Sequence, residues 1–101
     1  MASFEAHVRA ALDLLPEELA RGLENVAVVV EDHNAEEPDL YGLFDEQPFM
    51  PAKISIYRRP LTEDFGHDPK RLEEEIRITV LHELAHYFGI DEDRLDELGY
   101  S

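Results

Sequence analysis

The sequence contains no cysteine, few basic residues and no long hydrophobic run, and each of these absences excludes a class of protein. Without cysteine among its 101 residues, the chain forms neither a disulfide nor a thiolate metal site. Any metal ion would have to be bound by histidine and carboxylate. The longest apolar run, Val26–Val30, is far too short to span a bilayer. Met1–Ala10 lacks the charged start and apolar core of a signal peptide, so we expect a cytoplasmic protein.

Acidic residues far outnumber basic residues in the chain. Asp and Glu total 24 against 9 Lys and Arg, which gives a formal net charge of −15. Nucleic acids and anionic membranes are bound by clustered Lys and Arg, so we expect neither as a partner. The simplest interpretation is a solvated acidic surface, which also tolerates cationic partners.

The length and composition predict one small folded domain that spans residues 1–101, because 44% of the residues are hydrophobic. Apolar residues recur at steps of three and four over Ser3–Leu15, which predicts a helix capped by Ser3. Pro16–Arg21 is predicted as a second, short helix closed by Gly22.

Two segments have the composition of strands. Val26–Val30 is continuously apolar and mostly β-branched, which predicts a strand buried on both faces. Lys53–Arg58 alternates apolar and polar residues, which predicts a half-exposed strand. Glu31–Pro51 is rich in turn-forming residues and is predicted as a long loop with a short extended piece at Leu40–Phe44. Arg59–His67 is predicted as a connector.

A long helix with clear start and end signals follows. Asp68 is a good N-cap, and Pro69 suits the first helical position. Gly89 is placed to end the helix in the left-handed conformation. A last short helix is predicted over Asp91–Leu98. The apolar ridge of the long helix recurs every four residues and consists of Leu72, Ile76, Val80, Leu84 and Phe88.

The end of the long helix carries the motif His-Glu-x-x-His. His82 and His86 are about one helical turn apart, so their imidazoles point the same way and can bind one metal ion. Glu83 lies beside the first ligand, where a glutamate accepts the proton of a zinc-bound water as general base. The ion also polarises a peptide carbonyl, which this water attacks. The motif therefore predicts a zinc site of the metallopeptidase type.

The motif requires a third protein ligand and an open position for water. Gly89 follows His86 by three residues and allows a sharp turn, after which the pattern H-E-x-x-H-x-x-G-x-x-H/D puts its last ligand at Glu92. A turn that differed by one residue would bring Asp91 or Asp93 to this place. One of these acids can instead cap the last helix. We interpret Glu92 as the third ligand and keep both neighbours as alternatives.

Three stretches of the chain resemble the bacterial minimal zincin-like metallopeptidase family. They are Val26–Asp32, Lys53–Leu61 and Val80–Ile90. The resemblance extends over Leu15–Gly99 and implies a small α+β zincin-like domain, in which a short mixed β-sheet packs against a long active-site helix. It implies zinc held at His82 and His86, with Glu83 as the base. The family often has Asp at the third-ligand position, where this chain has Glu92.

We therefore predict a zinc-dependent peptidase that acts on a peptide or protein. Peptidases of this type pair an extended substrate with an edge strand, and Lys53–Arg58 is the candidate edge. Larger metzincins follow the helix with a methionine-containing turn below the metal, and no methionine follows Gly89 here. We expect a shallow groove and weak or narrow activity, unless a dimer or a partner completes the cleft.

Three alternatives are compatible with the motif. The first is a zinc-binding interaction module that keeps the fold without proteolysis, for which Glu83→Gln leaves the biological role intact. The second is a metal-dependent endoribonuclease, which uses three histidines and a basic groove; the acids after Gly89 and the net charge of −15 disfavour it. The third is a structural site with four protein ligands, against which the spare Glu83 argues.

Overall fold

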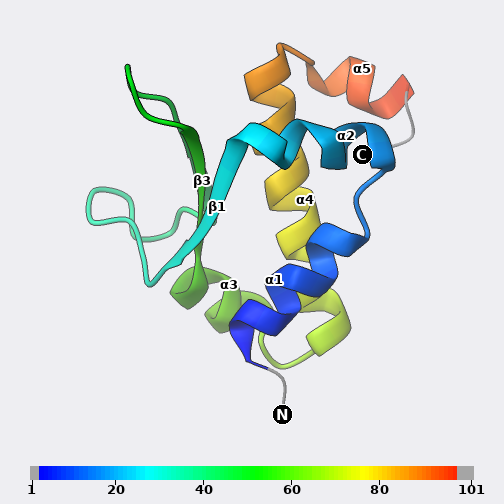
Figure 1. Cartoon of the computed structure of the whole chain (residues 1–101). Helices are drawn as coiled ribbons and strands as arrows, with labels where there is room; N and C mark the ends of the chain where they lie inside the picture. Colours follow the sequence, from blue (N-terminus) through cyan, green and yellow to red (C-terminus); the bar gives the residue numbers. More distant parts are fainter. Residues whose placement is uncertain (1–2, 98–101) are drawn as a thin grey trace.

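The chain folds into a small β-sheet with helices packed beside it (Figure 1). The computed structural model describes residues 3–97, except for the side chains of Glu18, Glu92 and Leu95, and Leu98 of the predicted last helix lies outside them. The predicted α+β class is confirmed. The elements in chain order are α1 (Phe4–Asp13), α2 (Glu17–Arg21), the 3-10 helix η1 (Gly22–Asn25), β1 (Val26–Glu31), β2 (Gly42–Asp45), β3 (Ala52–Tyr57), α3 (Arg58–Phe65), α4 (Pro69–Phe88) and α5 (Glu92–Glu97).

The two predicted N-terminal helices are confirmed. Ser3 caps α1, and its Oγ accepts a hydrogen bond of 3.2 Å from the Ala6 N–H. Gly22 follows α2 with φ of −64°, so the chain continues directly into η1 without a left-handed turn. A Cβ at Gly22 would lie 2.5 Å from Cζ of Phe88. A larger residue at this position would require the exposed ring of Phe88 to shift.

The sheet has the strand order β1–β3–β2, so β3 is its central strand. β1 pairs with β3 in parallel and β2 pairs with it antiparallel, which makes the sheet mixed, as expected. The prediction of a half-exposed edge at Lys53–Arg58 is therefore wrong. Ser55 is only 2% exposed, because it lies in register with Val29 on one side and Leu43 on the other. Larger neighbours on the adjacent strands cover this small polar residue.

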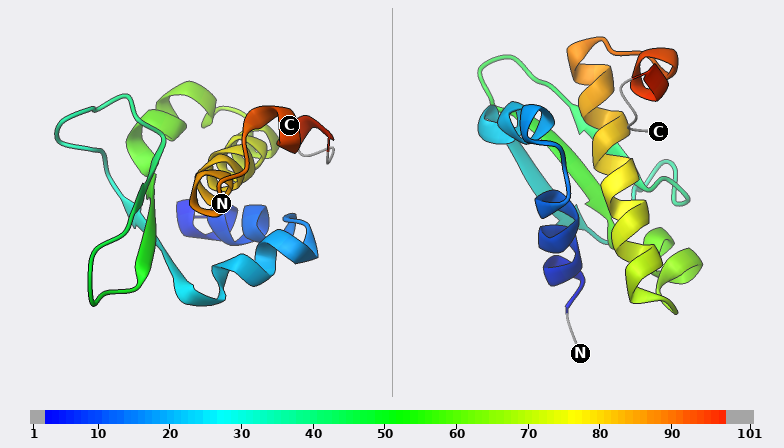
Figure 2. Two further views of the ribbon diagram at one scale, coloured as in Figure 1. Left: turned by 90° about the horizontal axis from the view of Figure 1, so that it is seen from above. Right: turned by 90° about the vertical axis from the view of Figure 1, so that its right-hand side faces the viewer.

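β1 is an edge strand, which corrects the prediction of a strand buried on both faces. Val28 and Val30 pack against the hydrophobic core, whereas Ala27 is exposed. A parallel strand is buried on both faces only when helices cover both of them. Here α1 and α4 lie on the same side of the sheet (Figure 2). A continuously apolar strand can thus be exposed on one face.

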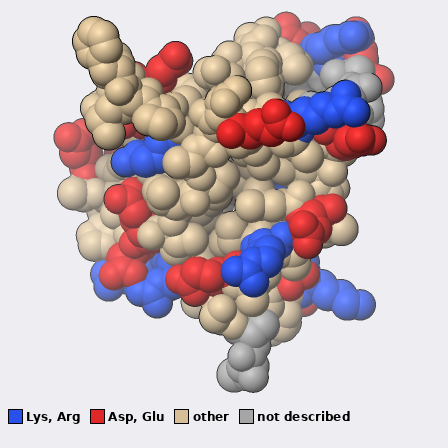
Figure 3. All heavy atoms as spheres, viewed as in Figure 1, with Lys and Arg blue, Asp and Glu red and all other residues tan. Residues whose placement is uncertain are grey.

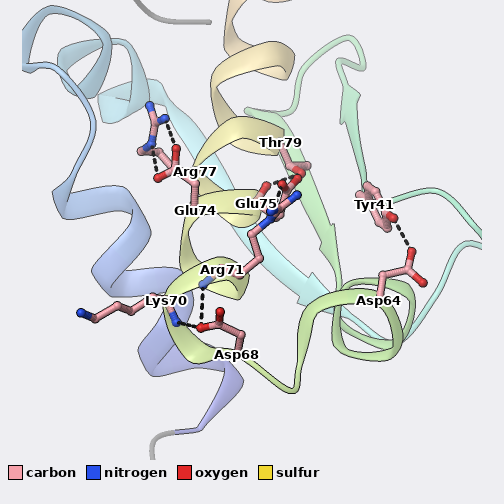
Figure 4. Close-up of polar contacts among 9 residues, drawn as sticks. All are labelled: Tyr41, Asp64, Asp68, Lys70, Arg71, Glu74, Glu75, Arg77 and Thr79. Carbon is pink, nitrogen blue, oxygen red and sulfur yellow. Dashed lines mark hydrogen bonds and ion pairs between the residues drawn. The ribbon is translucent and has the colours of Figure 1, made fainter.

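Helix α4 forms the centre of the core and begins and ends as predicted. The Asp68 side chain accepts hydrogen bonds from the backbone N–H groups of Lys70 and Arg71 (Figure 4). Gly89 has φ of 70°, the left-handed conformation that ends a helix. Phe88, predicted to continue the apolar ridge, is instead 47% exposed. The buried residues of α4 are Leu72, Ile76, Val80, Leu81, Leu84 and Ala85.

The segment predicted as a connector forms a helix, α3. Pro60 occupies its first turn, where a missing N–H removes no helical hydrogen bond. Pro60 and Leu61 are its buried residues, which are too few to produce a helical period in the sequence. The short extended piece predicted at Leu40–Phe44 is confirmed as β2. No helix in residues 3–97 is long and apolar enough to cross a membrane.

Candidate active site

His82 and His86 lie in the last turns of α4, on the side that faces away from the core. His82 is half-buried and His86 is exposed. The opposite side of these turns is anchored by Leu81, Leu84 and Ala85, which are 0%, 0% and 1% exposed. Residues four apart share a helix face. Burial of the apolar side therefore turns both imidazoles outward together.

Glu83 is held against strand β2. Its Oε2 accepts a hydrogen bond from the backbone N–H of Phe44, with an N···O distance of 3.0 Å. This N–H lies on the edge of β2 that does not pair with β3, because it is directed at α4. Sequence reasoning missed Phe44, since the contact joins residues 39 positions apart. The only sequence signal for β2 was the short extended piece predicted at Leu40–Phe44.

The Glu83 carboxyl group is half-buried, and burial raises its pKa above the usual value for glutamate. Three weaker influences lower the pKa: positive charge on His86, the hydrogen bond from Phe44 and positive charge on His82. A carboxylate with a raised pKa is a better proton acceptor near neutral pH. The structure thus places a basic carboxylate within electrostatic reach of both imidazoles.

Helix α4 ends in a tight turn that reverses the chain. The Gly89 N–H donates to the His86 carbonyl at 3.2 Å, and the Ile90 N–H donates to the Ala85 carbonyl at 2.8 Å. These bonds use carbonyl groups that have no partner within the helix. The turn after His86 has the form that the motif predicts, and α5 begins directly beyond it.

The three acids that follow the turn have different surroundings. Asp91 Oδ1 accepts a hydrogen bond of 2.8 Å from the Arg94 N–H, so Asp91 caps α5, which is the alternative that the sequence left open for one of these acids. Asp93 is exposed. Glu92 begins α5, but its side chain lies outside the described part of the chain. The assignment of Glu92 as third ligand therefore stays a prediction.

The described residues supply part of a zinc site. Imidazole is a nitrogen ligand that zinc prefers, and the two on α4 share one helix face. Within residues 3–97, no group of three or more His, Asp or Glu is placed to hold a metal ion. His82 and His86 thus fit two positions of the site, and a third donor has to come from a side chain such as that of Glu92.

An aromatic cluster adjoins the Glu83 carboxylate, and we define it as Phe44, Tyr87 and Phe88. The rings of Phe44 and Tyr87 are tilted by 39° with centroids 4.9 Å apart. Tyr87 and Phe88 meet edge to face with centroids 5.0 Å apart. These are favourable geometries for aromatic pairs. No local pattern in the sequence brings Tyr87 together with Phe44, which lies on a different element.

Comparison with models of known protein families gives a match over most of the chain. A family model described as zincin-like metallopeptidase matches residues 23–100. The match includes all three strands and the whole of α4, and it leaves α1 outside. It confirms the resemblance found in the sequence, and the family implies a metal cofactor. A comparison with curated protein sequences gives no match.

Proposed function

Because the chain belongs to the zincin-like metallopeptidase family, we propose that it hydrolyses peptide bonds with Glu83 as the general base. The observation that carries the proposal is the position of Glu83, half-buried beside two imidazoles and hydrogen-bonded to Phe44. His82, His86 and Glu92 would hold a zinc ion. When bound, zinc supplies Lewis acidity that lowers the pKa of water and polarises a carbonyl group.

The Glu83 carboxylate is arranged to accept and return a proton. The hydrogen bond from Phe44 restrains one oxygen and so orients the other, which can take a proton from water. Burial raises the pKa of the group and improves it as an acceptor, while the hydrogen bond from Phe44 favours its ionised form. The same group can then donate the proton to the leaving amine.

We propose that the peptide substrate adds to the edge of β2 that does not pair with β3, where the Phe44 N–H already donates to Glu83, in place of the predicted Lys53–Arg58. β2 is an edge strand, and the Phe44 N–H connects its outer edge to Glu83. An extended peptide gains main-chain hydrogen bonds when it adds to a sheet edge. The other edge, β1, has β3 between it and β2, so it lies farther from Glu83.

The surface beside this edge is open, which supports weak or narrow activity. His86, Tyr87 and Phe88 are all exposed. A substrate bound to so open a surface is oriented by few contacts, and orientation accounts for much of an enzyme's rate. We therefore propose that a second copy of the chain or a protein partner completes the cleft.

The test compares zinc-loaded wild-type protein with a Glu83→Ala variant on unfolded casein. We expect slow cleavage by the wild type and none by the variant. The proposal would be wrong if zinc-loaded wild type cleaved neither casein nor any member of a peptide library. Metal analysis of His82→Ala examines the site separately, and we expect the loss of about one equivalent of zinc per chain.

A non-proteolytic zinc-binding interaction module is the second candidate. The exposed aromatic cluster favours it, because aromatic residues are enriched where proteins bind one another. This function requires zinc binding and partner binding but not the base. A Glu83→Gln variant that kept the biological role, together with no hydrolysis by the wild type, would favour this candidate.

A further inference from the structure

The aromatic cluster is accessible to a ligand. Tyr87 is 39% exposed and Phe88 is 47% exposed. Phe44 joins the cluster to the base, since its ring packs on Tyr87 and its N–H donates to Glu83. The cluster therefore lies next to the Glu83 carboxylate.

Strand β2 and helix α4 run side by side in the same direction. A Cβ at Gly42 would lie 2.5 Å from Cγ2 of Thr79, and two residues along β2 Phe44 contacts Glu83, four residues along α4. Two residues of strand and four residues of helix each span about 6 Å, which explains this matching of contacts. The residues that follow β2 therefore lie toward the C-terminal end of α4, as does the aromatic cluster.

The chain segments that form this region carry more negative than positive charge, although Lys53 lies in register with Asp45 and Arg94 pairs with Glu97 on α5. Residues 33–52 and 78–93 contain no Lys or Arg. Elsewhere, arginines pair with carboxylates, as Arg77 does with Glu74, and basic and acidic side chains lie beside each other on the face in Figure 3. The described acids that adjoin the ends of β2 and α4 are Asp45, Glu46, Asp91 and Asp93.

We propose that the aromatic cluster is the subsite for an apolar side chain of a peptide substrate, and that the adjoining acids select substrates with Lys or Arg on either side of it. This inference rests on the proposed function, whose substrate class it narrows. An apolar side chain gains by covering exposed aromatic surface. Flanking cations match the excess negative charge around the cluster, which favours encounter and excludes acidic peptides.

The test measures binding separately from cleavage. It uses full-length zinc-loaded Glu83→Gln protein, because glutamine retains an oxygen that can accept the Phe44 N–H while the peptide stays intact. The probes are fluorescein-labelled peptides read by anisotropy: Arg-Arg-Leu-Arg-Arg, the same peptide with alanine at its centre, and Glu-Glu-Leu-Glu-Glu. We expect the leucine peptide with arginines to bind most tightly and the acidic peptide not to bind.

Two further variants in the Glu83→Gln protein separate the contributions of the cluster and of the acids. Tyr87→Ala is expected to weaken binding of the leucine peptide by about fivefold and to leave the alanine peptide unchanged. Glu46→Gln with Asp93→Asn is expected to weaken both cationic peptides by about threefold and to reduce their salt dependence. Glu46 and Asp93 are chosen because both are exposed and neither caps a helix.

The control variants change the same chemistry elsewhere. Leu14→Ala removes an exposed apolar side chain next to α1, and Glu5→Gln with Asp13→Asn removes two exposed acids on α1. Neither control is expected to alter any dissociation constant. Equal binding of the cationic and acidic peptides, no binding of any peptide, or an unchanged affinity in Tyr87→Ala would overturn the inference. Peptide binding without cleavage by the wild type would instead contradict the proposed function alone.

Discussion

The two halves of α4 differ in what covers them. In the first half, Leu72 and Ile76 are buried in the core, and Asp68 closes the start of the helix. In the last turns, buried residues occupy one side only, while His86, Tyr87 and Phe88 are exposed. Both halves of the helix thus contribute to the core, and the last turns also present polar and aromatic side chains on their other side. The candidate site is therefore built on a helix whose other side is anchored in the core.

The largest expected effect is on the rate of hydrolysis, from a substitution in the last turns of α4. Glu83→Gln should lower the rate of peptide hydrolysis by about 10²–10⁴-fold, because it removes the general base. Zinc content and thermal stability should remain those of the wild type, since the variant retains the size and hydrogen-bond acceptor of the side chain. Assay of a fluorogenic peptide, metal analysis and thermal unfolding would measure the three quantities. A variant that still hydrolysed at the wild-type rate would remove Glu83 from the mechanism.

A substitution of a buried residue in the first half of α4 should lower stability. Ile76→Ala is expected to lower the free energy of unfolding by about 2–5 kcal/mol, because Ile76 is 0% exposed and the change leaves a cavity. His86→Ala is the matched change on the exposed half, and it should change stability by less than about 0.5 kcal/mol in metal-free protein. Urea denaturation of both variants measures the contrast. Equal losses in the free energy of unfolding would mean that His86 contributes as much to stability as the buried Ile76.

A substitution in the turn that ends α4 should have an intermediate effect on stability. Gly89→Ala is expected to destabilise the protein by about 1–2 kcal/mol, because Gly89 has φ of 70°, which alanine tolerates poorly. A Cβ there meets no atom within 4 Å, so strain and not collision is the cause. Gly89→Asn should cost less, since asparagine adopts the left-handed conformation more readily. Equal unfolding free energies for Ala and Asn would contradict this explanation.

The smallest expected effect concerns the contact between β2 and the base. Phe44→Pro removes the N–H that orients Glu83, and proline is tolerated because this N–H lies on the unpaired edge of the strand. Phe44→Ala is the control, because it removes the ring and keeps the N–H. We expect kcat to be about fivefold lower in the proline variant than in the alanine variant, with similar folded fractions by circular dichroism. Equal kcat values would show that the hydrogen bond does not position Glu83.

Prediction from the sequence succeeded where the signals were local. Ser3 and Asp68 were recognisable as caps and Gly89 as the helix end, because each depends on residues within one turn. Prediction failed at Ser55, whose burial depends on side chains of two other strands. It also failed for α3, whose two buried residues show no period.

Helix α4, its two ends and the spacing that turns His82 and His86 to one side were predictable from the sequence, because helix geometry relates residues that are close in the chain. The position of β2, and not of Lys53–Arg58, at the edge beside Glu83 became visible only in the folded chain. The same holds for the contact by which Phe44 joins Tyr87 and Phe88 in the aromatic cluster. Strand order and contacts between distant segments follow from how the whole core packs, and no local pattern of residues carries that information.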